Sequence, residues 1–390
     1  MRELRLHPKA DKRVRLGHAW VFSNEVEIAI TPLATFAPGE LARVMDSRGQ
    51  PIGLAYVNPK SLICARILTS DSRATIDRSW IRRRIDRAVA LRDEIFGRPY
   101  YRAVFGESDG LPGVVIDRFG DVLSVQINTA GALALREPLF GAIEDVLAPR
   151  GILLRTPSSV SELEGIPTIR ERIGEVPDAV EIHEGAMHCV APLMEGQKTG
   201  YFYDQRDNRA RLARYVRPGS SVLDLYSYVG AWSIAAAQCG AGSVVTVDSS
   251  PLAIDYAGQN AQRNAVTLDL HCGDALAVTR SLGAQGKRFD VVILDPPALI
   301  KRRKSQHAGE AHYEQLHIDA FAVLREGGTL ITSSCSHHLP ADRLGRIALE
   351  AARKSGRRLQ ILERHAHAPD HPVHPAMPET EYLKTLFLRA

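Results

Sequence analysis

Two segments about forty residues apart carry the residue types best suited to chemistry on a substrate. In FDVVILDPPALI, at 289–300, an apolar run ends in Asp295, and two prolines without backbone N–H groups follow it. In LITSSCSHH, at 330–338, a second apolar run ends in a turn of small residues that carries Cys335. Ligands of open α/β sheets bind beyond the carboxyl ends of the strands, so both groups could act on one substrate there. The pair predicts covalent catalysis with Cys335 as the nucleophile.

Cys335 also has a structural interpretation, because a free cysteine is often a small buried hydrophobe. Its position between two serines and before two histidines, at an expected strand end, favours catalysis. The other four cysteines lie in apolar surroundings and are expected to be structural: Cys64, Cys189, Cys239 and Cys272. Five scattered cysteines without CxxC spacing favour a reducing cytoplasm over a disulfide framework.

A row of acidic residues follows successive apolar runs and predicts a nucleotide-like cofactor. Asp224 and Gly230 follow the first run, and Asp248 ends the second. At such positions a carboxylate can bind ribose hydroxyls, and a glycine permits a ligand to approach the backbone closely. Asp274 ends the third run, in a position to accept a hydrogen bond from an adenine amino group. Gly230 stands alone rather than in GxGxxG, which disfavours a pyrophosphate and favours S-adenosylmethionine (SAM). For each single aspartate, the alternative is a helix N-cap.

The elements that must position these residues are strands alternating with helices from about residue 190 onward. Apolar runs of this kind, separated by helical segments, predict a doubly wound parallel sheet. The expected strands lie at 221–227, 243–250, 268–275, 290–297 and 328–336, with a last one at 381–390. The expected helices lie at 231–239, 251–264, 275–282 and 312–325.

The length of 390 residues predicts two or three domains, and the pattern before residue 190 indicates two. Residues 1–72 show short alternating strands broken by turn signals, typical of a small β-barrel. Residues 73–188 combine a helix that begins near Asp77, a helix at 136–147 and several strands, which predicts an α+β domain. The C-terminal domain is expected to span 189–390.

The formal net charge of +4 is mild, so any nucleic-acid site must come from local clusters. The run Lys301, Arg302, Arg303 and Lys304 follows the Asp-Pro-Pro turn and is expected to clamp RNA phosphates. The arginines at 82–84 are expected to lie on a solvated helix face. No stretch has the length and apolarity of a membrane span. Prolines interrupt the histidine-rich tail, so no metal site is expected there.

Across its whole length the chain resembles a known family, the PUA-domain 23S ribosomal RNA cytosine-C5 methyltransferases that use SAM and a single catalytic cysteine. The matching elements are GHAWVFSNEV at 17–26, DGLPGVVIDRFG at 109–120, GQKTGYFYDQRDNR at 196–209, VLDLYSYVGAW at 222–232, VVTVDSS at 244–250, LDPPA at 294–298, SSCSHH at 333–338, DHPV at 370–373 and PETEYLK at 378–384. The resemblance implies a PUA-like RNA-binding barrel, a small α+β middle domain and a Rossmann-like class I methyltransferase domain.

The resemblance also implies roles for residues beyond the strand ends. Cys335 falls on the catalytic cysteine. Asp295 is expected to take part in catalysis by hydrogen-bonding the N3/N4 edge of the base and offsetting charge as C6 is attacked. The segment with Lys198 and Arg206 borders the SAM pocket. The SAM-binding residues implied are Tyr201, Asp204, Gln205, Asp224, Tyr226, Gly230, Asp248, Asp274 and Asp295. Many RNA cytosine-C5 enzymes carry a second cysteine where this chain has Ala298, and the single-cysteine subtype lacks it too.

The implied reaction adds the Cys335 thiolate to C6 of cytosine, which makes C5 reactive toward the methyl group. The implied partner is 23S ribosomal RNA, either naked or in a large-subunit assembly intermediate. Two alternatives stay open: methylation of an exocyclic base amine (guanine N2 or adenine N6), and a non-catalytic RNA-binding assembly factor. The sequence does not choose between a monomer and a homodimer.

Overall fold

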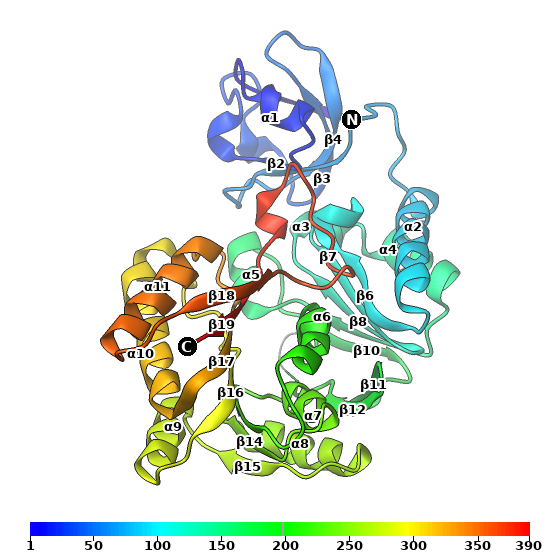
Figure 1. Cartoon of the computed structure of the whole chain (residues 1–390). Helices are drawn as coiled ribbons and strands as arrows, with labels where there is room; N and C mark the ends of the chain where they lie inside the picture. Colours follow the sequence, from blue (N-terminus) through cyan, green and yellow to red (C-terminus); the bar gives the residue numbers. More distant parts are fainter. Residues whose placement is uncertain (197–198) are drawn as a thin grey trace. The chain divides into compact units, whose positions relative to one another are not determined.

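The computed structural model describes residues 1–196 and 199–390, and these form two compact units that alternate along the chain (Figure 1). Lys198 lies outside the described residues. The first unit consists of Met1–Val180, Leu193–Tyr203 and Pro369–Thr380. The second unit consists of Glu181–Pro192, Asp204–Ala368 and Glu381–Ala390. The domain boundaries expected at 72 and 188 stay a prediction.

The N-terminal part of the first unit is a sheet of short strands, as its turn-rich sequence predicts. Its strands are β1 (Arg2–Arg5), β2 (Trp20–Val21), β3 (Glu40–Met45), β4 (Pro51–Val57) and β5 (Ala65–Thr69). They lie in the order β1-β3-β4-β5-β2, and only the β1–β3 pair is parallel. Alternate residues such as Val44, Ala55 and Val57 point into one apolar core, which also receives Val14 of the short helix α1 (Asp11–Arg15).

A second sheet of the first unit has five strands in the order β10-β9-β8-β7-β6. These are β6 (Tyr100–Phe105), β7 (Val114–Phe119), β8 (Val122–Ile127), β9 (Gly151–Arg155) and β10 (Arg170–Gly174), with helices α2 (Arg78–Phe96), α3 (Ala130–Ala134), α4 (Arg136–Leu147) and α5 (Ser158–Glu164). Asp77 starts α2 by accepting the backbone N–H of Trp80, and Gly97 ends it with φ +64°. The expected start near Asp77 is therefore confirmed, whereas β6, α5 and β10 were not expected.

A buried ion network attaches the late segment Pro369–Thr380 to the first unit. Arg92, on α2, is fully buried and binds both carboxylate oxygens of Asp109 at 2.8 Å. The same guanidinium donates to the backbone carbonyl of Asp370 at 2.9 Å, and the Asp370 carboxylate accepts the backbone N–H of Arg102 at 2.9 Å. Because buried charges need partners, these bonds fix where the segment returns.

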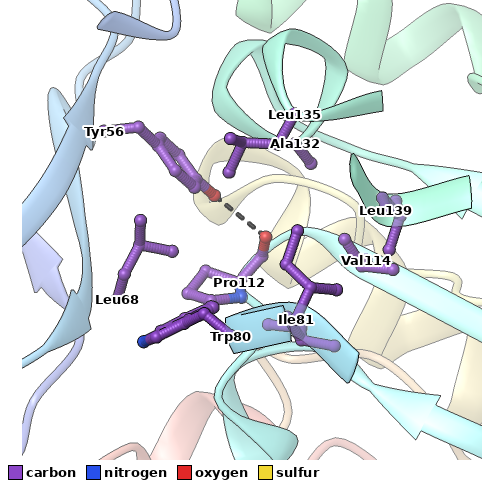
Figure 2. A pocket seen from close by; sticks show the side chains of 10 residues that line it. Tyr56, Leu68, Trp80, Ile81, Pro112, Val114, Ala132, Leu135 and Leu139 are labelled. Carbon is purple, nitrogen blue, oxygen red and sulfur yellow. Dashed lines mark hydrogen bonds between the residues drawn. The ribbon is translucent and has the colours of Figure 1, made fainter. Parts of the chain in front are cut away.

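A cavity in the first unit is structural rather than a ligand site (Figure 2). Its volume is about 20 Å³, little more than one water molecule needs. The only polar bond drawn across it joins the Tyr56 hydroxyl to the carbonyl of Pro112, at 2.9 Å. Its walls are otherwise mainly apolar: Leu68, Trp80, Ile81, Leu111, Val114, Ala132, Leu135 and Leu139.

The second unit is a seven-stranded sheet in the order β15-β14-β13-β16-β17-β19-β18. The strands are β13 (Ser221–Leu225), β14 (Ser243–Asp248), β15 (Asp269–Cys272), β16 (Phe289–Leu294), β17 (Leu324–Ser334), β18 (Gln360–His365) and β19 (Lys384–Arg389). Strands β13 to β17 are parallel, and β19 runs antiparallel between β17 and β18. The expected doubly wound parallel sheet is confirmed, with one antiparallel strand near its edge.

Helices cover both faces of this sheet (Figure 1). They are α6 (Arg206–Ala210), α7 (Ala231–Gln238), α8 (Pro251–Arg263), α9 (Ala275–Ala284), α10 (Gln306–Val323) and α11 (Ala341–Lys354). Leu223 and Leu225 point toward α9, α10 and α11, whereas Val222 points toward α7. Burial on both faces explains the near-continuous apolar runs that predicted the central strands β13, β14, β16 and β17. Helix α10 begins six residues before the expected position 312, and α11 and β18 were not expected.

The strands β11 (Ala179–Glu184) and β12 (Met187–Pro192) form a separate two-stranded sheet. Among the described residues, no helix combines the length and apolarity needed to cross a membrane.

Candidate active site

The topology of the second unit brings the two chemical motifs to one edge of the sheet. Strands β16 and β17 are parallel neighbours, with Leu294 opposite Thr332. Asp295 directly follows β16, and Cys335 directly follows β17, so both stand at the carboxyl ends of adjacent strands. The chain reverses its direction of sheet growth between β13 and β16, and open α/β sheets bind ligands at such a switch point.

Hydrogen bonds hold the turn of Cys335 against the loop that follows Asp295. The backbone N–H of Ile300 donates to the Ser336 hydroxyl at 3.1 Å. The Tyr313 hydroxyl, from α10, donates to the Ser334 hydroxyl at 2.8 Å. Burial raises the pKa of Tyr313, and the negative charges of Cys335 and Asp295 act in the same direction. One phenol therefore lies within electrostatic reach of both the thiolate and the carboxylate.

Asp295 is held by two donors from other elements. Gln205 donates from its side-chain amide to one carboxylate oxygen at 2.9 Å, and the Trp232 indole donates to the other at 3.1 Å. Burial raises the pKa of Asp295 to about 6, and the nearby charge of Asp204 adds to this shift. The bonds from Trp232 and Gln205 oppose the shift. Asp295 and Gln205, both expected at the site, are thus in direct contact.

Asp224, the acidic residue within β13, has one oxygen without a partner. Its side chain is fully buried, and one oxygen accepts the Ser233 hydroxyl at 2.6 Å. Its other oxygen is buried and has no hydrogen-bond partner in the described part of the chain. Burial raises the pKa of Asp224 to about 7, and the charges of Asp295 and Asp248 reinforce this. An unpaired buried acceptor is costly in a folded protein and is typical of a ligand site.

The two remaining acidic strand ends bind the backbone. Asp248 accepts the N–H groups of Tyr228 and Ser250, each at 2.9 Å, and thereby shapes the loop after β13. Asp274 is the N-cap of α9 and accepts the N–H of Ala277 at 2.9 Å. The alternative interpretation as a helix cap is therefore confirmed for Asp274. Carboxylate oxygens have several lone pairs, so both residues keep capacity for a ligand.

The loop between β13 and α7 is conformationally strained. Tyr226 and Tyr228 have φ values of +66° and +50°, in the left-handed region that residues other than glycine rarely adopt. Tyr226 is partly buried; burial raises its pKa to about 12, and the nearby charges of Asp274 and Asp248 contribute. Such strain is typical of functional loops.

Gly230, in the same loop, has φ +82°. A Cβ there would lie 3.0 Å from the Cβ of Ala257, on α8. The sequence suggested that this glycine lets a ligand approach the backbone. The neighbour found here is a helix, so tight loop–helix packing and the positive φ both require glycine.

The segment 201–206 is divided between the two units. Asp204 lies in the second unit, where its carboxylate accepts the Tyr382 hydroxyl at 2.6 Å. Arg206 lies there too and forms an ion pair with Glu184 at 3.8 Å. Tyr201 belongs to the first unit and packs edge-on against Tyr203, with ring centroids 5.2 Å apart.

The basic run Lys301–Lys304 lies in the loop between β16 and α10, on the carboxyl side of the Asp-Pro-Pro turn. All four side chains are exposed. Within the described ranges none of them forms an ion pair, so the four charges face solvent. No group of three or more potential metal ligands gathers anywhere in residues 1–196 and 199–390.

Comparison with known proteins places this geometry in a family. Residues 4–70 match the model of a PUA-like domain, and residues 169–389 match that of an S-adenosylmethionine-dependent methyltransferase. The chain belongs to this methyltransferase family. Ribosomal RNA large subunit methyltransferase I from Shewanella amazonensis is 37% identical and covers 99% of this chain and 98% of its own length. The protein of that name from Yersinia pseudotuberculosis is 35% identical, with 96% coverage of both chains.

Solved structures agree with the fold of the methyltransferase. A methyltransferase crystallised with SAH has a TM-score of 0.86 at 19% identity, and both chains are fully covered. A SAM-dependent methyltransferase from Streptococcus mutans has a TM-score of 0.84 at 19% identity, also with full coverage. The expected combination of a PUA-like N-terminal domain with a Rossmann-like methyltransferase fold, and the SAM cofactor, are thus confirmed.

The residues of the second unit fit the chemistry of SAM, which carries ribose hydroxyls, an ammonium group and a sulfonium cation. The unpaired oxygen of Asp224 is an acceptor that lacks a donor, and SAM supplies donors. The neighbouring carboxylates of Asp248 and Asp295 repel the charge of Asp224, and a cation among them would relieve that repulsion.

Three side chains of the methyltransferase contact the site but were not predicted from the sequence. Trp232 and Tyr313 lie on helices, where apolar spacing indicates only core packing. Lys384 lies in the last strand, and its ammonium donates to the backbone carbonyl of Ser336 at 2.7 Å. The only sequence signal was its place in the element PETEYLK at 378–384.

Proposed function

We propose that the protein methylates C5 of a cytosine in 23S ribosomal RNA through a covalent bond between the Cys335 sulfur and C6 of the base. The observation that carries the proposal is the joint position of Cys335 and Asp295 beyond adjacent parallel strands, in turns tied by the Ile300–Ser336 bond. The name of the full-length relatives, ribosomal RNA large subunit methyltransferase I, supports the RNA substrate. The PUA-like domain supports it as well.

The cofactor site proposed for SAM lies at the same sheet edge. SAM supplies the methyl group as an electrophilic carbon on its sulfonium. Asp224 offers its unpaired oxygen, and Asp248 and Asp274 offer remaining lone pairs at the neighbouring strand ends. Gly230 keeps the loop compact beside them. The predicted residues that belong to the second unit are Asp204, Gln205, Asp224, Tyr226, Gly230, Asp248, Asp274 and Asp295. Tyr201, also predicted from the resemblance, belongs to the first unit.

Cys335 gives up its proton and its thiolate bonds to C6, which pushes electrons toward C5 and places negative charge on the N3 side of the ring. Burial raises the pKa of Asp295 to about 6. A carboxyl group with such a pKa can share a proton with N3 near neutral pH. C5 takes the methyl group and then loses its proton to solvent. The electron pair of the C5–H bond re-forms the C5–C6 double bond and expels the Cys335 thiolate, which restores both the aromatic base and the cysteine.

RNA binding is assigned to two surfaces. The exposed side chains of Lys301, Arg302, Arg303 and Lys304 flank the Asp-Pro-Pro turn and offer four cations to phosphates. The PUA-like domain offers the second surface. Because the pocket must enclose C5 and C6, the target cytosine has to leave any base stack.

The experiment uses full-length protein, SAM and a large-subunit ribosomal RNA fragment that carries 5-fluorocytosine. Fluorine at C5 cannot leave as a proton does, so a Cys335 adduct should accumulate and survive denaturing electrophoresis. The variant Cys335→Ala should form no adduct, and Cys272→Ala, which removes an exposed cysteine, should form it normally. Methyl transfer to unmodified RNA by Cys335→Ala would refute the mechanism and favour exocyclic-amine methylation instead.

A further inference from the structure

Lys384 is a buried lysine that the sheet places beside Cys335. Strand β19 enters the sheet antiparallel to β17, and their register sets Lys384 opposite Ser334. Ser334 directly precedes Cys335 in the sequence. Only 9% of the Lys384 residue is exposed, and lysines are seldom so buried without a paired charge. Its position therefore calls for an anionic partner.

The hydrogen bonds of Lys384 do not supply an anionic partner. Its ammonium donates to the carbonyl of Ser336 at 2.7 Å and to the carbonyl of Tyr382 at 2.8 Å. Both acceptors are neutral, and an ammonium has three N–H groups, so one donor remains. No carboxylate forms an ion pair with Lys384 within the described ranges. Ser336 directly follows Cys335, so the hydrogen bond to its carbonyl holds the ammonium near the turn that carries the thiol.

The electrostatics of Lys384 point to the same partner. Burial lowers the pKa of Lys384 to about 8. Two groups that are negative when ionised oppose this change, first Cys335 and then the exposed Glu381. Buried ammonium groups lose their proton unless an anion holds it.

Two titratable groups that act on the turn of Cys335 within the described ranges supply no positive charge. Tyr313, from α10, and Asp295, after β16, are neutral or negative. His337 follows two residues later and packs its ring against Tyr382, with centroids 6.0 Å apart. Lys384, on β19, is a cation that the sheet holds beside the turn of Cys335.

We propose that the Lys384 ammonium is the counter-charge that holds Cys335 in its thiolate form. The inference rests on the proposed function, in which Cys335 is the nucleophile. Lys384 acts as a positioning residue and forms no bond with the substrate. The thiol proton passes to solvent, and the Lys384 ammonium gives up none of its protons in this step.

The test measures how readily Cys335 alkylates as a function of pH in the full-length, SAM-free protein. Iodoacetamide reacts with the thiolate, and mass spectrometry of the peptide that contains Cys335 separates it from the other cysteines. Lys384→Gln removes the charge but keeps amide donors for the two carbonyls. An opposite charge at close range shifts a pKa by about 1–3 units, so the midpoint should rise by about one unit or more.

Two further variants separate charge from folding. Lys384→Arg keeps the positive charge and should restore a midpoint close to that of the natural protein. Lys354→Gln removes an exposed lysine on α11, which pairs with Glu314 at 2.8 Å, and should leave the midpoint unchanged. Equal midpoints in the natural protein and in folded Lys384→Gln, judged by an unchanged thermal transition, would overturn the proposal. A midpoint that stays high in folded Lys384→Arg would overturn it too.

This measurement needs neither RNA nor methyl transfer, so its result can contradict the role of Lys384 without contradicting the proposed function. If the 5-fluorocytosine adduct forms but the midpoint does not move, Cys335 is the nucleophile and the role of Lys384 is wrong. If the midpoint moves but no adduct forms, Lys384 stabilises the thiolate and the proposed reaction is wrong.

Discussion

Asp224→Asn should make the SAM-free protein more stable at pH 8. Asp224 is fully buried, has one oxygen without a partner and has a pKa raised to about 7 from a usual value of 3.8. Because the folded state favours the protonated form, this group supports folding below pH 3.8 and loses that contribution as the pH rises through 7. At pH 8 the folded protein therefore holds a charge that the unfolded chain carries more easily.

The size of the effect follows from the shift. About three pKa units at 1.36 kcal/mol each give at most about 4 kcal/mol at pH 8. Asparagine has nearly the same shape and can still accept the Ser233 hydroxyl, so most of this penalty should disappear in the variant. At pH 5 the natural Asp224 is already protonated, and the variant should gain little. The gain must therefore depend on pH.

The assay is thermal unfolding of both proteins without SAM at pH 5 and pH 8. Half of the upper bound, about 2 kcal/mol, should raise the midpoint by roughly 4–8 °C in a unit of this size. Asp290→Asn is the matched control at the other end of β16. Burial works to raise the pKa of Asp290, but hydrogen bonds from Ser221 and the ion pair with Arg325 outweigh it and lower the pKa. This control should lose stability at pH 8.

The same variant should respond less to the cofactor. SAM raises the unfolding midpoint of any protein that binds it only when folded. If Asp224 accepts a donor from SAM, that rise should be smaller in Asp224→Asn. A lower midpoint for SAM-free Asp224→Asn at pH 8, or an equal gain at pH 5 and pH 8, would refute the reasoning.

Two further predictions concern the ion network and the basic run. Arg92→Met should destabilise the first unit by about 3–5 kcal/mol, because it leaves the buried Asp109 carboxylate without its guanidinium partner. Thermal unfolding measures this loss. The control Arg78→Met removes an exposed ion pair and should change the unfolding midpoint little. Alanine at all four positions of 301–304 should lower the slope of log affinity against log salt for RNA by up to about 3. Replacing the exposed Arg82 and Arg83 should leave that slope intact, and an equal loss in both variants would contradict a specific clamp.

The central strands β13, β14, β16 and β17 of the second unit could be predicted because they are buried on both faces. Burial of this kind demands apolar residues at every position, and Val291–Leu294 is an example. Local signals also predicted the start of α2 at Asp77, since a cap is formed by residues close in sequence. The carboxylate and the thiol were predicted to share a site because parallel neighbours present their carboxyl ends together.

Long-range arrangements could not be predicted from the sequence. The return of Asp370 to the first unit depends on Arg92 and Arg102, which lie far away in the sequence. The neighbour of Gly230 was also hidden, because a lone glycine does not reveal whether a ligand or a helix lies beside it. Lys384 reaches Cys335 only because β19 inserts antiparallel beside β17. Strand order is a property of the whole sheet.

The edge of the sheet separates two kinds of charge, and this separation suits the proposed reaction. Asp224, Asp248 and Asp295 crowd negative charge near the switch point, where a sulfonium cation would reduce their repulsion. Two strands further, Lys384 places a positive charge where a thiolate needs it. Each arrangement is unfavourable without its partner, since burial disfavours both the carboxylates and the ammonium. Sites that bind and react often depart from the rules of stable packing in this way. The strain at Tyr226 and Tyr228 fits the same account, because it lies in the loop that follows Asp224 and that Asp248 binds through the Tyr228 N–H.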